Sequence, residues 1–215
     1  MRVLFLVLAG LILVPVIAFS AAAESRPAAT TLNFAVMRNG ERIGTTTMRL
    51  SRDGREVIAD VVTHIQVKIA YITVYRYEQH ETERWVDGKL VAMHSQTDDN
   101  GTAHKVSATR SGDVLSVDAD GKVAEVDPAL IPVSLWNPWL LHTRTAINTQ
   151  DGSVTPVSVV DHGEEPLVLQ GRATTARHYS IKTSFPQDVW YDRQYQLLKV
   201  ELRGSDGSTI QYRLG

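Results

Sequence analysis

The feature that most constrains this chain is a series of short turn signals along its first half. Asn-Gly and Asp-Gly favour the tight turns of β-hairpins, because these residues accept a positive φ at low cost. Six signals of this kind recur between alternating segments: Asn39-Gly40, Asp53-Gly54, Asp87-Gly88, Asn100-Gly101, Ser111-Gly112 and Asp120-Gly121. Consecutive hairpins of this spacing predict an antiparallel β protein.

The expected strands are the alternating segments between and beyond these turns. They lie near residues 31–38, 41–51, 55–68, 74–86, 89–98, 102–110, 113–118, 122–126, 154–160, 166–170, 173–183, 187–192, 196–203 and 208–214. None of these segments shows a sustained helical period, and no linker-like composition marks a domain boundary. The sequence therefore predicts a mainly β protein: one domain over residues 24–215, built as a single curved antiparallel sheet or open half-barrel.

The N-terminal segment has the composition of an export signal. One positive charge at Arg2 precedes an apolar run from Val3 to Phe19, and small residues follow in a pattern that a signal peptidase accepts. A retained membrane anchor is the alternative, but the run contains Pro15 and is short for a transmembrane helix. Residues 1–23 are predicted to be a cleaved signal peptide, so we expect a periplasmic or secreted protein.

Charge and cysteine content exclude several classes of function. The formal net charge of -2 provides no basic stripe for a phosphate backbone, so we expect no nucleic-acid partner. A chain of 215 residues with no cysteine has no disulfide, no thiolate chemistry and no acylated cysteine. The seven histidines are scattered without metal-ligand spacing, and no phosphate loop or dinucleotide fingerprint occurs. We therefore expect no metal site and no cofactor.

An apolar insertion over residues 127–147 interrupts the strand pattern. It contains three prolines and two of the four tryptophans, Trp136 and Trp139, followed by Leu140. Since an indole can bury about 150–250 Å², this segment should fold back onto the sheet. Two interpretations stay open: a plug that completes the core, and a lid over an apolar pocket.

The central hairpin, residues 74–86 and 89–98, carries polar groups on its expected inner face. A two-residue turn at Asp87-Gly88 sets Glu81 opposite His94. The residues that share this face are Tyr77, Gln79, Glu81, Glu83 and Trp85. A buried Glu81–His94 pair needs mutual hydrogen bonding, and it is either a partly solvated ion pair or a polar anchor inside a ligand cavity. The same pair is the one candidate acid–base couple, so no catalytic residue is otherwise assigned.

Two turn-flanked aromatic motifs resemble those of an uncharacterised family of exported bacterial proteins, a domain of unknown function. One motif runs from Trp85 to Val91, and the other contains Trp190 in Val189–Asp192. The match extends over roughly residues 31–214. The Trp-x-Asp-Gly-x-Leu and Trp-Tyr-Asp patterns are also similar to those of LolA/LolB-like lipoprotein carriers. That resemblance implies an open, strongly curved sheet with a lid over a lipid-binding hollow, although this chain lacks the lipid-attached cysteine of LolB-type proteins and the helical lid of LolA-type carriers.

Together these features predict a periplasmic protein that binds an apolar or amphipathic, lipid-like ligand without changing it. The expected ligand-binding residues are Tyr77, Gln79, Glu81, Trp85, His94, Trp136, Trp139, Leu140 and Trp190. Two alternatives stay open: an envelope structural or protein-interaction module whose sheet edge pairs with a partner strand, and a hydrolase that uses Glu81 and His94. The sequence does not determine the ligand's identity or the oligomeric state.

Overall fold

The computed structural model describes residues 28–215, so the predicted signal peptide, residues 1–23, lies outside the described residues. The strands are β1 (Ala28–Arg38), β2 (Glu41–Asp53), β3 (Glu56–Ile69), β4 (Ile72–Val86), β5 (Lys89–Asp99), β6 (Thr102–Ser111), β7 (Val114–Ala119), β8 (Lys122–Val126), β9 (Thr145–Ile147), β10 (Val154–Pro156), β11 (Ser158–Leu169), β12 (Arg172–Lys182), β13 (Gln187–Tyr191), β14 (Leu197–Arg203) and β15 (Thr209–Leu214). One 3₁₀ helix, η1 (Pro138–His142), precedes β9. Among residues 28–215, no helix is long and apolar enough to cross a bilayer.

Thirteen strands form one antiparallel sheet in the order β11-β12-β13-β14-β15-β1-β2-β3-β4-β5-β6-β7-β8. The order follows the chain except at one point, where the last strand, β15, pairs with the first, β1, and Phe34 lies opposite Leu214. The sheet is not closed into a barrel, so β11 and β8 are its two edges. The predicted fold class is therefore confirmed.

The predicted strands differ from the observed ones mainly in the second half. Residues 161–165 were expected to form a break, but β11 continues through them because a β-bulge between Asp161 and Gly163 absorbs the irregularity. Gly163 adopts a φ of 86° there, which a glycine tolerates. The short strand β9 was not predicted, because three residues are too few for an alternation signal.

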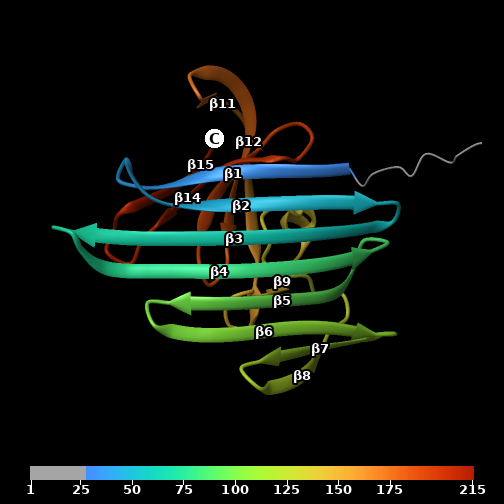
Figure 1. Cartoon of the computed structure of the whole chain (residues 1–215). Helices are drawn as coiled ribbons and strands as arrows, with labels where there is room; N and C mark the ends of the chain where they lie inside the picture. The colour runs from blue at the N-terminus through green and yellow to red at the C-terminus, as the bar shows by residue number, and fades with distance from the viewer. Residues whose placement is uncertain (1–27) are drawn as a thin grey trace, which may run out of the picture.

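The sheet bends around the insertion. Figure 1 shows β1–β8 as one layer, with β12, β14 and β15 passing behind it at a steep angle and the insertion lying behind the same layer. Residues of both halves of the sheet and of the insertion share one hydrophobic core on the concave side, which includes Phe34, Met93, Leu140, Ile147 and Val189. A smaller cluster of Ala176, Trp190 and Leu198 forms a second, separate core.

Candidate ligand-binding hollow

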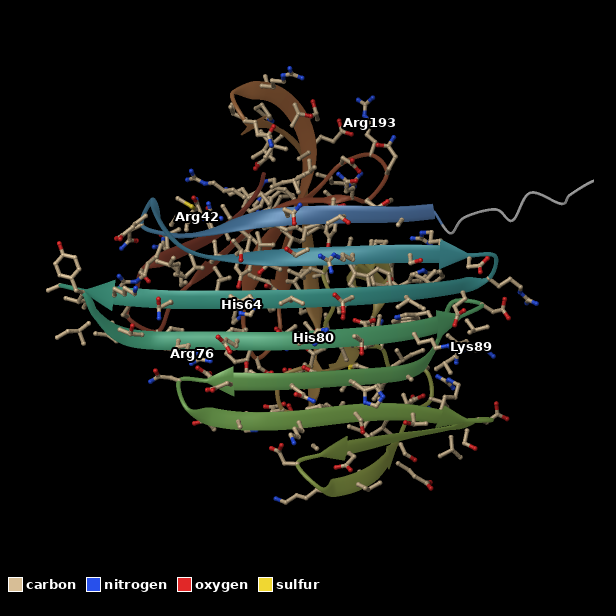
Figure 2. All side chains as sticks on the ribbon, viewed as in Figure 1. Arg42, His64, Arg76, His80, Lys89 and Arg193 are labelled. Atoms are coloured by element: carbon tan, nitrogen blue, oxygen red, sulfur yellow. The ribbon has the colours of Figure 1, made fainter. Side chains whose placement is uncertain are left out.

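The concave side of the sheet contains a hollow of about 800 Å³. Strand alternation explains its wall: on β3, Val61, Thr63, Ile65 and Val67 face the hollow, whereas His64 between them is exposed on the outer face. Figure 2 shows His64 and His80 on the face turned to the viewer, opposite the insertion. Other apolar members of the wall are Phe34, Met48, Leu135, Trp136, Leu197, Val200 and Leu202. Small-molecule sites are typically apolar and roughly 300–1,000 Å³ in volume, so the hollow has the size of a ligand site.

Two carboxylates and a serine lie at the inner part of this hollow. Glu81 and Glu83 both point inward from β4, because they are two residues apart on one strand, and Glu83 is only 1% exposed. Ser134, from the insertion, donates a hydrogen bond to Glu83 Oε1, and its hydroxyl lies 3.1 Å from Glu81 Oε1. Of the two carboxylates, Glu81 lines the hollow.

Two tryptophans complete the surroundings of Glu83. Trp85 Nε1 donates to Glu83 Oε2 at 2.6 Å, and Trp136 Nε1 donates to Glu83 Oε1 at 3.2 Å. The two indoles pack edge to face, with centroids 5.9 Å apart. Glu83 thus joins β4 to the insertion and satisfies three buried donors, which is the arrangement that makes a buried carboxylate tolerable.

Burial raises the pKa of Glu81 well above its usual value of 4.5, and the neighbouring Glu83 carboxylate raises it further, while hydrogen bonds with Ser134 and Thr149 partly oppose this rise. Two carboxylates in one dry site resist joint ionisation. Glu81 therefore favours the neutral acid, which both donates and accepts hydrogen bonds and can meet an uncharged polar group of a ligand.

This raised pKa predicts a dependence of stability on pH. Because the folded pKa lies above the unfolded one, the contribution of Glu81 is complete below the usual Glu pKa of 4.5 and is lost as pH rises through the folded pKa. We expect Glu81→Gln, which keeps a neutral donor, to unfold with a flatter pH profile than the wild type. Urea unfolding from pH 5 to pH 9 measures this difference. If the free energy of unfolding changed with pH to the same extent in both proteins, Glu81 would ionise freely in the folded state.

A belt of polar residues follows the carboxylates along β4 toward the mouth of the hollow. Tyr77 Oη donates to Gln79 Oε1 at 3.1 Å, and Gln79 Nε2 lies 3.2 Å from Ser95 Oγ and 3.3 Å from Thr149 Oγ1. Burial raises the pKa of Tyr77, so its hydroxyl stays protonated. The predicted residues Tyr77, Gln79 and Glu81 are thus brought together on one wall, and Trp136 lies on the opposite, insertion side.

The predicted pairing of Glu81 with His94 is wrong. A β-bulge at Val91 lies between the Trp85–Leu90 and Arg84–Ala92 pairs, so the residues beyond it shift by one position. Glu81 lies opposite Ser95, and His94 lies opposite Thr82 and is exposed on the outer face. A one-residue shift moves a side chain to the other face of the sheet, which separates this pair.

Four other predicted residues lie outside the wall of the hollow. Trp85 is buried behind Glu83, Leu140 is fully buried in the main core, and Trp190 belongs to the second core. Trp139 is 69% exposed, since its position in η1 directs it away from the core. The insertion both completes the core, through Leu140 and its neighbours, and walls the hollow, through residues 133–136.

Three residues of the site were not predicted: Glu83, Ser134 and Thr149. Alternation correctly predicted Glu83 on the same inner face as Glu81, but Glu83 was not among the predicted ligand-binding residues. Ser134 and Thr149 lie on the insertion and on the loop between β9 and β10, where no periodicity gives the direction of a side chain. Only tertiary packing brings them to β4.

An open, barrel-like antiparallel sheet with an internal apolar hollow is the class of protein that this fold and site define. A similar fold occurs in a crystal structure described as a β-barrel-like protein of domain of unknown function DUF1849 from Brucella abortus. The two share 8% sequence identity with a TM-score of 0.62, over 88% of this chain and 96% of the other. No curated protein matches the sequence.

The chain belongs to the family described as domain of unknown function (DUF6134), which matches residues 34–215. The predicted membership of an uncharacterised domain family is confirmed. The Brucella protein shows the fold alone, because its sequence identity to this chain is low.

Proposed function

We propose that this protein is exported to the periplasm and binds an amphipathic, lipid-like molecule in the hollow without changing it. The observation that carries the proposal is the hollow itself: about 800 Å³ of space whose wall combines apolar side chains with polar groups such as Glu81, Gln79 and Tyr77. Burial of a ligand's apolar part would supply the affinity, at about 25 cal/mol per Å² before ordering costs. Glu81, Gln79 and Tyr77 would orient a polar group of the ligand.

The length of the hollow favours an elongated ligand. Its wall on β4 extends from Val74 at the mouth to Glu81. At about 3.3 Å per residue, these seven steps correspond to roughly 23 Å. A hollow of this length can accommodate an extended hydrocarbon chain beside the apolar side chains of its wall.

The β3–β4 hairpin at the mouth supports a ligand that comes from a membrane. Its tip is apolar and exposed: Tyr71 is 100% exposed, Ile72 69% and Ile69 61%. Ala70 and Tyr71 have φ values of 46° and 71°. The turns at Asn39-Gly40 and Asn100-Gly101 also have positive φ values, but Asn and Gly adopt them at lower cost. An exposed apolar tip held in a costly backbone conformation is poorly explained by folding stability.

The charges near this tip also suit a membrane surface. Among the described residues, neither Arg42 nor Lys68 forms an ion pair. Figure 2 shows Arg42 at the end of the sheet where the β3–β4 hairpin turns, together with Arg76, which pairs with Glu78. Unpaired cations beside an apolar tip favour an anionic lipid surface, with the tip residues at the level of the headgroups. Ile69 and Val74 both line the hollow, so the tip and the ligand site are continuous.

A variant that fills the hollow tests the proposal. Ile65 is half-buried and faces the hollow, so Ile65→Trp should occupy the ligand's space. We expect at least a tenfold loss of lipid that copurifies with protein from the periplasm, measured by native mass spectrometry and by solvent extraction. The matched control is His64→Trp, the adjacent residue on the outer face, which should retain the wild-type amount. Equal lipid in both variants, or none in the wild type, would overturn the proposal.

The interaction-module alternative is favoured by one feature, the two open edges of the sheet. The edge strand β8 is mostly exposed, and an exposed edge can pair with a partner strand. The same mass spectra distinguish the two functions, because a module would copurify with a protein and a carrier with a lipid. The hydrolase alternative loses its acid–base couple, since Glu81 and His94 lie on opposite faces.

A further inference from the structure

A second cluster of polar side chains lies on the outer face of β11, β12 and β13, on the other side of the sheet from the hollow. One ligand atom from each of His162, His178 and Asp188 lies within 4.8 Å of the other two. We propose that these three residues bind one late first-row divalent cation, such as Zn²⁺. The proposal is independent of the ligand in the hollow.

The fold brings these residues together from three strands. The β-bulge at Asp161 and Gly163 leaves His162 as the extra residue of β11, so it is not paired across the strand. His178 on β12 lies opposite Trp190 of β13, and Asp188 is two residues before Trp190 on the same face. His162 is two residues after Val160, which lies opposite Ser180, so strand alternation places His162 on the same face as His178.

His178 is already oriented as a metal ligand. Its Nε2 lies 3.1 Å from Asp188 Oδ1, close to the separation of two ligands on one small cation. Its ring stacks on Trp190, with centroids 4.4 Å apart, and its Nδ1 lies 3.7 Å from Glu165 Oε2. Glu165 is held in turn by a hydrogen bond of 2.5 Å from Trp190 Nε1. A carboxylate behind the second ring nitrogen is the usual outer-shell partner of a metal-bound histidine.

His162 supplies the movable ligand. Its ring stacks on His178 at 4.5 Å, and its Nε2 lies 2.8 Å from Ser180 Oγ, which donates to Asp188 Oδ1 at 2.5 Å. Because His162 is exposed, its ring can turn out of the stack and direct an in-plane lone pair at a cation. The Ser180 hydroxyl lies between the His162 imidazole and the Asp188 carboxylate.

The local charge favours a cation. Two carboxylates, those of Asp188 and Glu165, lie beside the His178 ring. The nearby Lys199 lies over the Trp190 ring at 3.9 Å and pairs with Glu201 at 3.0 Å, so it is compensated. Two imidazoles and one carboxylate suit Zn²⁺, Ni²⁺ or Cu²⁺, whereas Mg²⁺ and Ca²⁺ prefer oxygen ligands. Water would fill the remaining coordination positions.

Calorimetric titration of tag-free, chelator-treated protein with ZnCl₂ tests the site. We expect one Zn²⁺ per chain, no heat with MgCl₂, and at least tenfold weaker Zn²⁺ binding in His162→Ala and in Asp188→Asn. Glu165→Gln should weaken binding by about tenfold, as outer-shell changes do. Imidazole NMR signals of His162 and His178 should shift on Zn²⁺ addition, in a protein whose melting temperature confirms folding.

The matched control is His80→Ala. His80 Nε2 lies 2.8 Å from Asp60 on the same kind of exposed sheet face, so it forms a His–Asp pair without a second histidine. Its loss should leave the Zn²⁺ affinity unchanged. Wild-type affinity in His162→Ala, or an equal loss in His80→Ala, would show only nonspecific binding to surface histidines and would overturn the proposal.

Discussion

Glu83→Ala is expected to lower the free energy of unfolding by about 3–5 kcal/mol, because each buried donor left without an acceptor costs roughly 1–3 kcal/mol and the lost side chain leaves a cavity. The Glu83 carboxylate accepts from Trp85 Nε1, from Trp136 Nε1 and from the Ser134 hydroxyl. Truncation leaves the two indole N–H groups buried without an acceptor, whereas Ser134 can still donate to Glu81, and it also creates a cavity. The loss is measured by urea unfolding at a single pH, with circular dichroism and tryptophan fluorescence as independent probes.

Two further variants distinguish lost hydrogen bonds from a general intolerance of change on β4. Glu83→Gln keeps the shape and one acceptor oxygen, so it should cost less than the alanine variant. Glu78→Ala changes an exposed glutamate on the same strand, which pairs with Arg76 at 2.6 Å, and should lower stability far less, because exposed ion pairs contribute little. If Glu83→Ala and Glu78→Ala lowered stability equally, Glu83 would not join the insertion to the sheet.

The double variant Ala70→Asn/Tyr71→Gly is expected to weaken binding to anionic vesicles by roughly 10- to 100-fold, because removing one large exposed apolar side chain forfeits about 1.5–3 kcal/mol of burial. The same change creates an Asn-Gly turn. Since residues in the left-handed region cost about 1–3 kcal/mol each, relief of this strain should raise the melting temperature. Vesicle flotation and thermal unfolding measure the two effects, which have opposite signs.

The control for this variant is Val168→Asn on β11. Val168 is 70% exposed, so the change removes a comparable exposed apolar side chain away from the β3–β4 tip. It should leave vesicle binding unchanged. Binding that persists in the double variant, or that Val168→Asn lowers by the same factor, would show that the hairpin tip is not the membrane-contacting surface.

The sequence predicted the strands well because their signals are local. The turn at Asp87-Gly88 and the alternation along β3 and β4 depend on residues next to each other in the chain, and the structure confirms both. The same alternation correctly placed Tyr77, Gln79 and Glu81 on the inner face. The bulge at Val91 carries no comparable signal, and one extra residue there was enough to move His94 to the outer face.

By itself, the sequence determined an antiparallel meander with an apolar insertion, since hairpin turns and side-chain period are properties of neighbouring residues. Only the tertiary structure decided that β15 pairs with β1, that Ser134 meets Glu81 and Glu83, and that the bent sheet leaves a hollow. These features join residues that are distant in the chain. They depend on the summed twist and bulges of many strands, which no short segment encodes.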